Sequence, residues 1–228
     1  MAKKRSRRYQ KAAARVDRSK RYSLVEGMAL LKSLAGPKFD ETVDIAVRIG
    51  IDAKKTEQLV RGSVSLPKGT GKSVKIAVFA DGEKAKEALA AGADFVGAAD
   101  LAEKIEKGFT DFDMTIASPD MMRFVGKLGK VLGPQGKMPS PKAGTVTPNV
   151  AAAVREFKAG KIEFRTDAGA NVHAAIGKKS FNADDLAVNL TAFVDHLRAL
   201  RPAQAKGTFI QKVVVSTSMG PGVTLAVE

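Results

Sequence analysis

The chain has 228 residues and is 44% hydrophobic, enough to build a packed core for one large or two modest domains. It has no cysteine, which excludes disulfides and thiolate metal sites, and no apolar run approaches the ~20 residues that a membrane span needs. The net charge of +14 is unevenly spread, because residues 1–22 carry ten basic side chains and one acidic one. This basic N-terminal arm is a solvated tail, a segment that binds an acidic membrane surface or, as we expect, a segment that binds nucleic acid.

The first flank of the folded region predicts a helix followed by half-buried strands. Ser23 and Glu26 form a capping-box pattern, apolar residues follow at helical spacing, and a Gly-Pro pair at 36–37 ends the helix. Residues 39–52 then alternate between apolar and polar, which is typical of a strand with one buried and one exposed face. The segment RGSVSLPKG continues this alternation.

The middle of the chain has a different pattern. VKIAVFA is an almost continuously apolar strand, and an alanine-rich helix, EKAKEALAAGAD, follows it. Next come the strand FVGA, the short helix DLAEKIEKG, the strand DFDMTIAS and the helix PDMMRFVGKLGKVLG. Apolar strands that alternate with short helices predict βαβ units around a buried, mostly parallel sheet.

The first pattern returns after the helix NVAAAVREFKAG. KIEFRTD and NVHAAIG predict short strands, NADDLAVNLTAFVDHLRALR predicts a long amphipathic helix, and GTFIQKVVVSTSMGPGVTLAVE predicts two strands around a turn. Because the two flanks share one pattern, we expect an α/β protein with two domains. Residues 1–67 and 160–228 would form a discontinuous outer α/β domain, and residues 68–159 an inserted βαβ domain.

Residues 132–149, LGPQGKMPSPKAGTVTPN, predict a long and stiff loop. They include four prolines, three glycines and no acidic residue. Each proline fixes its own φ and restricts the residue before it, which argues against a flexible linker. Loops of this length inside a compact domain are usually functional or disordered, so we expect this basic loop to be functional.

The sequence contains no recognisable catalytic constellation. GTGKS, residues 69–73, resembles the end of a phosphate-binding loop, but Leu66 stands where the pattern requires glycine and a strand follows instead of a helix. Neither His173 nor His196 has a second ligand at a metal-binding offset, and there is no GxSxG motif. We expect no enzyme activity, no metal and no cofactor, with a nucleotide-dependent enzyme as the alternative that GTGKS raises.

Nucleic-acid binding fits the residues better. Aromatic residues are only 6% of the chain, too few for a module that stacks single-stranded bases. Structured RNA, or DNA held by its backbone, is bound instead through cations, hydroxyls and backbone amides. The exposed face of the first strand offers Thr42, Asp44 and Arg48. The turn TSMGPG, residues 217–222, offers hydroxyls and glycines that permit a close approach, unless it is only a hairpin connection.

Six segments, in order, carry a resemblance to a known family: KFDETVDIAVRIGID, VRGSVSLPKGTGK, AGADFVG, LGPQGKMPSPKAGTVTPN, AGKIEFRTD and STSMGP. Along almost its whole length the sequence resembles the bacterial L-one family of large-subunit ribosomal proteins. The resemblance implies two α/β domains, a discontinuous outer sandwich domain built from both chain ends and an inserted Rossmann-like inner domain. It also implies a cytoplasmic, ribosome-associated structural protein, monomeric when free, that binds large-subunit rRNA in the mobile stalk at the tRNA exit site. The other implied partners are exit-site tRNA, whose release it assists, the messenger of its own operon, which it represses, and further components of the large subunit.

The resemblance also implies which residues bind RNA. The implied rRNA and mRNA contacts are Lys38, Phe39, Thr42, Asp44, Arg48, Arg165, Asp167, His173, Thr217, Ser218, Met219 and Gly220. In and just before the 132–149 loop, we assign Lys130, Gln135, Lys137 and Lys142 to contact with either the tRNA or the other domain. No catalytic residue is implied. A generic basic DNA-binding protein is the remaining alternative, and it rests on the charge alone.

Overall fold

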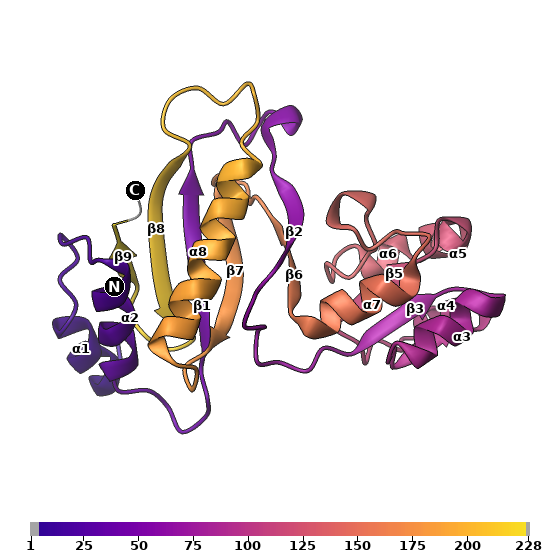
Figure 1. Ribbon diagram of the computed structural model, residues 1–228, viewed down its shortest axis with the longest axis horizontal. Coiled ribbons are helices and arrows are strands. Elements are labelled where there is room, and N and C mark those ends of the chain that lie inside the picture. Colours follow the sequence, from indigo (N-terminus) through magenta and orange to yellow (C-terminus); the bar gives the residue numbers. More distant parts are fainter. Residues whose placement is uncertain (1–4, 227–228) are drawn as a thin grey trace. The chain divides into compact units, whose positions relative to one another are not determined.

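The computed structural model describes residues 5–226, and their mixture of helices and sheets confirms the predicted α/β class (Figure 1). The described residues divide into two compact units. Residues 5–71 and 162–226 form one, the outer unit, and Lys72–Lys161 form the other, the inner unit. Each unit has its own buried core.

The outer unit is built on a four-stranded antiparallel sheet in the order β7-β1-β8-β9. Its strands are β1 (Thr42–Ile49), β7 (Asn171–Lys178), β8 (Ile210–Thr217) and β9 (Val223–Leu225). The predicted alternation in the first strand is confirmed, because Val43, Ile45 and Val47 are fully buried and the residues between them are not. A second sheet pairs β2 (Arg61–Ser65) with β6 (Lys161–Arg165).

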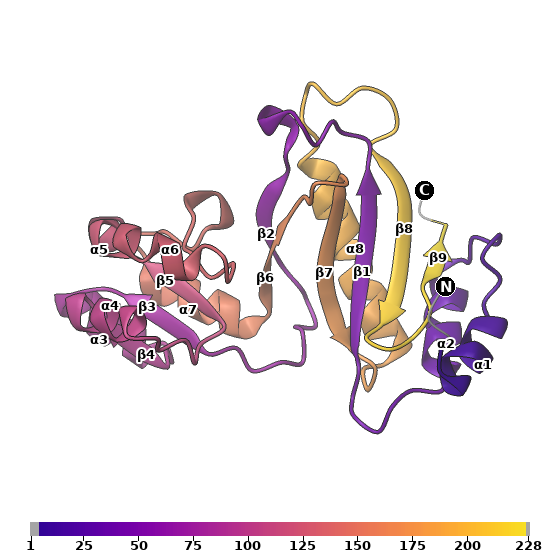
Figure 2. The ribbon, with the colours of Figure 1, turned by 180° about the vertical axis from the view of Figure 1, so that it is seen from behind.

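One face of the four-stranded sheet is covered by the long helix α8 (Ala183–Ala199) (Figure 1). Leu186, Leu190 and Phe193 of this helix share a core with the inward side chains of β1. From behind, the strands lie in front of α8 and no described helix of this unit covers them (Figure 2). The sheet therefore has an open face, and Thr42, Asp44 and Arg48 belong to it.

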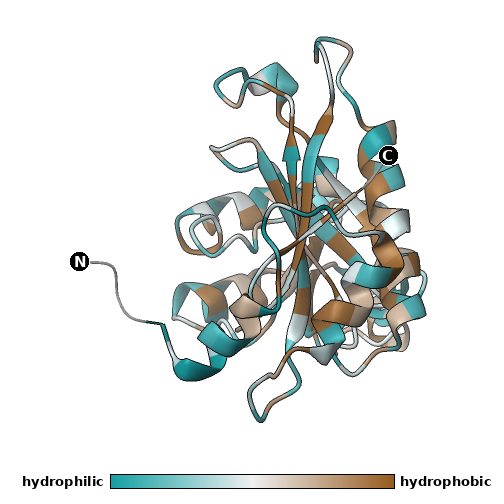
Figure 3. Cartoon of the chain, turned by 90° about the vertical axis from the view of Figure 1, so that its left-hand side faces the viewer, coloured by the Kyte–Doolittle hydropathy of each residue, from teal (hydrophilic) through white to brown (hydrophobic). Residues whose placement is uncertain are grey.

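Two helices precede the sheet, α1 (Arg7–Ala14) and α2 (Leu24–Ser33), and a short 3-10 helix, η1 (Thr56–Gln58), follows β1. The Ser23 hydroxyl accepts a hydrogen bond from the backbone N–H of Glu26 at 3.3 Å, which confirms the predicted cap of α2. The described part of the basic arm is not a solvated tail. Its helix α1 is largely hydrophilic (Figure 3), yet Ala12 and, just beyond the helix, Val16 are buried in the core of the outer unit.

The inner unit has a three-stranded parallel sheet in the order β4-β3-β5, as the βαβ pattern predicts. Its strands are β3 (Ile76–Phe79), β4 (Phe95–Gly97) and β5 (Met114–Ala117). β3 is buried along its whole length because separate apolar clusters pack on its two faces. The helices α3 (Gly82–Ala90) and α7 (Val150–Ala159) contribute to one cluster, and α4 (Ala99–Glu106) contributes to the other.

The single helix predicted from PDMMRFVGKLGKVLG is wrong. The structure has three short pieces instead, η2 (Pro119–Met121), α5 (Met122–Lys127) and α6 (Gly129–Leu132). At the break, the backbone N–H of Leu128 donates to the carbonyl of Val125, three residues earlier. Gly126 and Gly129 flank this break, and a glycine inside a helix costs about 1 kcal/mol relative to alanine.

The 132–149 loop is fixed to its own unit. It contains a short 3-10 helix, η3 (Pro141–Ala143), which Gly144 ends with a φ of 70°. Beyond it, Val146 forms a parallel bridge to Ala117 at the end of β5. The Thr115 hydroxyl of β5 donates to the backbone carbonyl of Lys137. These contacts confirm a stiff loop rather than a flexible linker.

Candidate nucleic-acid interface

The open face of the outer sheet brings together side chains from three strands. Strand register places Asp44 of β1 between Ala175 of β7 and Ser216 of β8. In the same way, Arg48 lies between Asn171 and Lys212. These side chains project from the face that α8 does not cover. The face is therefore a patterned polar surface on a rigid sheet.

Asp44 is the one carboxylate that β1 contributes to this face, and its surroundings are unusual for an exposed strand. Burial raises the pKa of Asp44, although the positive charge of Lys178 and interaction with His173 oppose this shift. The Lys178 ammonium also donates a hydrogen bond to the Thr42 hydroxyl at 2.9 Å. Lys178 thus places a positive charge near the Asp44 carboxylate.

The turn after β8 is held against the start of β1. The Ser218 hydroxyl accepts a hydrogen bond from the backbone N–H of Thr42 at 3.2 Å, and the Ser218 N–H donates to the Thr42 carbonyl at 3.1 Å. The Gly220 N–H donates to the Thr217 carbonyl at 3.0 Å, which closes the turn. Thr217 itself is only 5% exposed, so its side chain faces the core instead of solvent.

Two large apolar side chains stand out of the surface beside this turn. Met219 is 53% exposed and Phe39 is 56% exposed, although both residue types are normally buried. The segment before β1 is held from the side, because Asp40 accepts hydrogen bonds from the backbone N–H and the hydroxyl of Ser180 at 3.1 and 2.7 Å. We call Phe39, Thr42 and residues 218–220 the turn site. Lys38 is exposed next to it.

Glu41 lies beneath the turn site and was not predicted from the sequence. It is 1% exposed, and its carboxylate accepts a hydrogen bond from the Met219 N–H at 2.9 Å. The Lys179 ammonium lies 3.6 Å from the same carboxylate and donates to the Leu34 carbonyl at 2.6 Å. A glutamate next to an alternating strand is indistinguishable from a solvated one in sequence, so only the fold reveals this anchor.

The Asp167 carboxylate organises the loop before β7. It accepts hydrogen bonds from the backbone N–H groups of Gly169 and Asn171 at 2.8 and 2.7 Å, and it lies 3.4 Å from His173. The backbone hydrogen bond from Asn171 is the main cause that lowers the pKa of Asp167. Arg165 is exposed at the end of β6. Of the predicted contacts here, Arg165 and His173 face solvent, whereas Asp167 is engaged within its own loop.

The residues assigned to tRNA or interdomain contact differ in their surroundings. Lys130, Gln135 and Lys142 are exposed on the inner unit. Lys137 instead points into its own unit, where its ammonium donates to the Thr110 carbonyl at 3.0 Å and lies 4.9 Å from the centre of the Phe112 ring. The Lys137 side chain therefore contributes to folding of the inner unit.

The GTGKS segment does not form a phosphate-binding loop. Asn189 of α8 accepts a hydrogen bond from the Lys68 N–H at 3.0 Å and donates to the Gly69 carbonyl at 2.9 Å. Lys72 pairs with Asp113 at 2.5 Å, and the chain then enters β3 without a helix between. Among residues 5–226, no group of His, Cys, Asp and Glu side chains could hold a metal ion. No helix in that part of the chain is long and apolar enough to cross a membrane.

Comparison with known sequences decides the family. The model of the ribosomal protein L1p/L10e family matches residues 31–221, which is most of the chain. The chain belongs to this family. It is 54% identical over 222 residues to a large ribosomal subunit protein uL1 of Kosmotoga olearia, covering 97% of this chain and 96% of that protein. It is also 56% identical over 217 residues to a protein of the same name from Burkholderia ambifaria, covering 95% and 94%.

Membership of this family confirms the resemblance carried by the six segments. The chain is a structural protein of the large ribosomal subunit and not an enzyme. The contacts of the GTGKS segment agree with this, because Asn189 holds the Gly69 carbonyl and Asp113 pairs with Lys72. The open face and the turn site of the outer unit are the candidate surfaces for binding its nucleic-acid partner.

Proposed function

We propose that the outer unit binds structured large-subunit rRNA through the turn site and the adjoining open face of the sheet. The observation that carries this proposal is the rigid turn itself. Its backbone is hydrogen-bonded to β1 at Thr42 and to the buried Glu41, yet Met219 and Phe39 remain more than half exposed. Two exposed apolar side chains, with hydroxyls and cations in the same region, suit a folded RNA surface better than bulk water.

The chemistry of the turn site supports RNA in particular. Backbone groups at Gly220 can approach a partner closely, and a Cβ at this position would collide with the Thr217 hydroxyl. Ser218 can exchange hydrogen bonds with a ribose 2′-hydroxyl, which DNA lacks. Arg48, Lys178 and Lys212 on the open face supply cations for phosphates, which fix the register of the partner without reading its sequence.

Finer roles, which family membership supports, form part of the same proposal. The chain would contribute to the mobile stalk at the tRNA exit site and assist release of deacylated tRNA, with exposed residues such as Lys130 and Lys142 near the tRNA. It would also repress translation of its own operon messenger by binding a similar RNA structure. In this proposal the protein is cytoplasmic and monomeric when free. The outer unit carries the rRNA site, and the inner unit is an inserted domain.

A competition assay tests the proposed function directly. The full chain should bind a bacterial large-subunit rRNA transcript in the presence of excess duplex DNA, and ATP or GTP at millimolar concentration should not compete. Equal binding to duplex DNA would instead support a generic DNA-binding protein. Saturable nucleotide binding would support the enzyme alternative.

Two substitutions test the turn site. Met219→Glu should weaken rRNA binding by at least about tenfold, equivalent to about 1.4 kcal/mol, because it places a negative charge against phosphate. Ser218→Val removes a neutral hydrogen bond worth about 1 kcal/mol and should also weaken rRNA binding.

Matched controls separate charge and shape from unfolding. Met219→Gln adds polarity without charge and should retain more affinity than Met219→Glu. Ser218→Thr keeps the hydroxyl and should bind like the wild type. Thermal unfolding confirms that each variant is folded. Wild-type affinity in both Met219→Glu and Ser218→Val would show that the turn is only a hairpin connection.

A further inference from the structure

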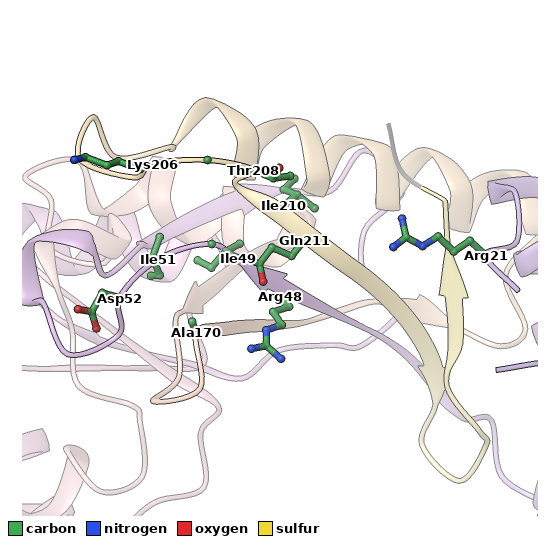
Figure 4. A pocket seen from close by; sticks show the side chains of 12 residues that line it. Arg21, Arg48, Ile49, Ile51, Asp52, Ala170, Lys206, Thr208, Ile210 and Gln211 are labelled. Atoms are coloured by element: carbon green, nitrogen blue, oxygen red, sulfur yellow. The ribbon is translucent and has the colours of Figure 1, made fainter. Parts of the chain in front are cut away.

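A basic groove lies at the end of the outer sheet away from the turn site. The turn site adjoins the start of β1, whereas the groove is formed where β1 ends and β8 begins (Figure 4). An eight-residue strand spans about 27 Å, so the two surfaces are separate. The groove has a volume of about 980 Å³. Its charged lining residues are Arg21, Arg48, Lys206 and Asp52.

The three cations come from different segments of the chain, and hydrogen bonds fix the backbone at or next to each of them. Arg48 lies within β1, between Asn171 and Lys212 in the sheet. Arg21 precedes Tyr22, whose backbone N–H donates to the Thr224 carbonyl at 2.9 Å and whose carbonyl accepts from Ala226 at 2.8 Å. The positions from which the Arg21 and Arg48 side chains project are therefore fixed by the sheet.

The backbone on either side of Lys206 is held by a side chain, that of Arg201. The Arg201 guanidinium donates hydrogen bonds to the carbonyls of Ala205 and Gly207, at 2.9 and 3.0 Å, on either side of Lys206. Gly207 adopts a φ of 75°, which a residue with a side chain rarely does. Arg201 thus fixes the loop that places Lys206 at the groove, while the Lys206 side chain stays exposed.

The three cations have no partner within the described protein. Arg21, Arg48 and Lys206 form no ion pair and no side-chain hydrogen bond with any of residues 5–226. The single acid of the groove, Asp52, accepts a hydrogen bond from the backbone N–H of Lys54 at 3.1 Å. The groove therefore holds three cations against one carboxylate, and its net positive charge is open to an anionic partner.

We infer that the basic groove is a second contact for the same RNA, and that it binds the phosphodiester backbone. This inference rests on the proposed function of the turn site. The cations are distributed along the groove on separate elements (Figure 4), which fits successive phosphates of one strand better than a single small anion. The other polar side chains of the groove, Thr208 and Gln211, are exposed, so we expect the groove to add affinity and orientation and to leave selectivity to the turn site.

The double variant Arg21→Ala/Lys206→Ala tests this inference in the full chain. Neither residue belongs to the turn site, and both side chains are exposed, so the variant should fold normally. Affinity for the large-subunit rRNA transcript is measured as a function of salt. Loss of two phosphate contacts should reduce the slope of log affinity against log salt by about 1.4 to 1.8. Selectivity over duplex DNA should stay unchanged.

A matched control removes the same charge elsewhere. Lys86 and Lys104 are exposed on α3 and α4 of the inner unit, and Lys86→Ala/Lys104→Ala lowers the net charge equally. This control should change the slope much less. Hydroxyl-radical footprinting adds a second readout, in which the groove variant should lose protection over one stretch of RNA and keep the stretch that Met219→Glu loses.

The outcomes separate the two proposals. If the wild type binds the transcript selectively but the groove variant keeps its slope and footprint, the groove inference is wrong and the turn site stands. An equal loss of slope in the control also overturns it, because only total charge then matters. If the groove variant binds RNA like the wild type but no longer binds an acidic polypeptide such as polyglutamate, the inference is wrong and the partner of the groove is a protein. If the wild type shows no selectivity, the proposed function fails and this inference falls with it.

Discussion

Replacing the buried Glu41 tests whether the turn site is held in position from below. In the folded protein its carboxylate accepts a hydrogen bond from the Met219 N–H at 2.9 Å and lies 3.6 Å from the Lys179 ammonium. Glu41→Ala leaves both donors without this acceptor. Met219 would then lose the contact that fixes its backbone, while its side chain and the surface charges stay intact. We therefore expect Glu41 to act as a positioning residue for the turn site.

The size of the effect follows from burial. Removing one partner of a buried ion pair typically destabilises a protein by about 3–5 kcal/mol. The Lys179 side chain is 19% exposed and keeps its hydrogen bond to Leu34, so water and that carbonyl compensate in part. We therefore expect Glu41→Ala to lower the free energy of unfolding by about 3 kcal/mol. Glu41→Gln keeps an acceptor for Met219 and should lose less, about 1–2 kcal/mol.

Urea unfolding measures the stability of both variants, and rRNA binding is then measured where both are fully folded. Glu41→Ala should bind at least about tenfold more weakly, with an unchanged salt slope because no phosphate contact is removed. Glu41→Gln should restore most of the affinity. A folded Glu41→Ala protein that binds rRNA like the wild type would refute the positioning role, whatever its stability. An affinity loss that Glu41→Gln shares fully would point to the charge instead of the anchor.

Asp44→Asn should raise stability at pH 7 and change it little near pH 3. Burial raises the pKa of Asp44, so the stability that its protonated carboxyl contributes is present below the ordinary pKa and is lost as the pH rises through the raised value. Urea unfolding at both pH values checks this prediction. A variant that is less stable than the wild type at pH 7 would contradict it. Deleting residues 72–160, with a short glycine linker, should leave an outer unit that folds and binds rRNA, since Asn189 holds Lys68 and Gly69 to that unit. Circular dichroism and a binding isotherm test the deletion, and a folded protein without selective binding would place essential contacts in the inner unit.

The periodic parts of the sequence predicted the fold well. Alternation gave the buried face of β1, and continuous apolar runs gave the buried parallel strands β3 and β5. These patterns work because burial of one or both faces of a strand dictates residue type directly. The prediction of one continuous helix after β5 was wrong. It relied on apolar residues at helical spacing, but the glycines at 126 and 129 interrupt the helix in the structure.

The site was predictable only in part, because burial and pairing depend on residues distant in sequence. The turn was recognisable from its glycines and hydroxyls, yet Thr217 proved buried, since β8 continues its inward alternation up to that residue. Lys137 had the composition of a surface cation, but Thr110 and Phe112 hold it within its own unit. Glu41 could not be recognised as part of the site from the sequence, because its partners lie more than a hundred residues away along the chain.

Pairing of charges supports the proposed interface more sharply than the net charge does. The ion pairs of the outer unit include Arg61 with Glu163 between β2 and β6, and Arg198 with Asp195 on α8, both away from the open face. The cations of the open face and the basic groove, such as Lys212 and Lys206, have no ion-pair partner among residues 5–226. Exposed ion pairs contribute little to stability, so leaving these cations unpaired costs the fold little. It keeps them available to phosphate, and if they bind RNA as we propose, we expect the affinity to fall as salt rises.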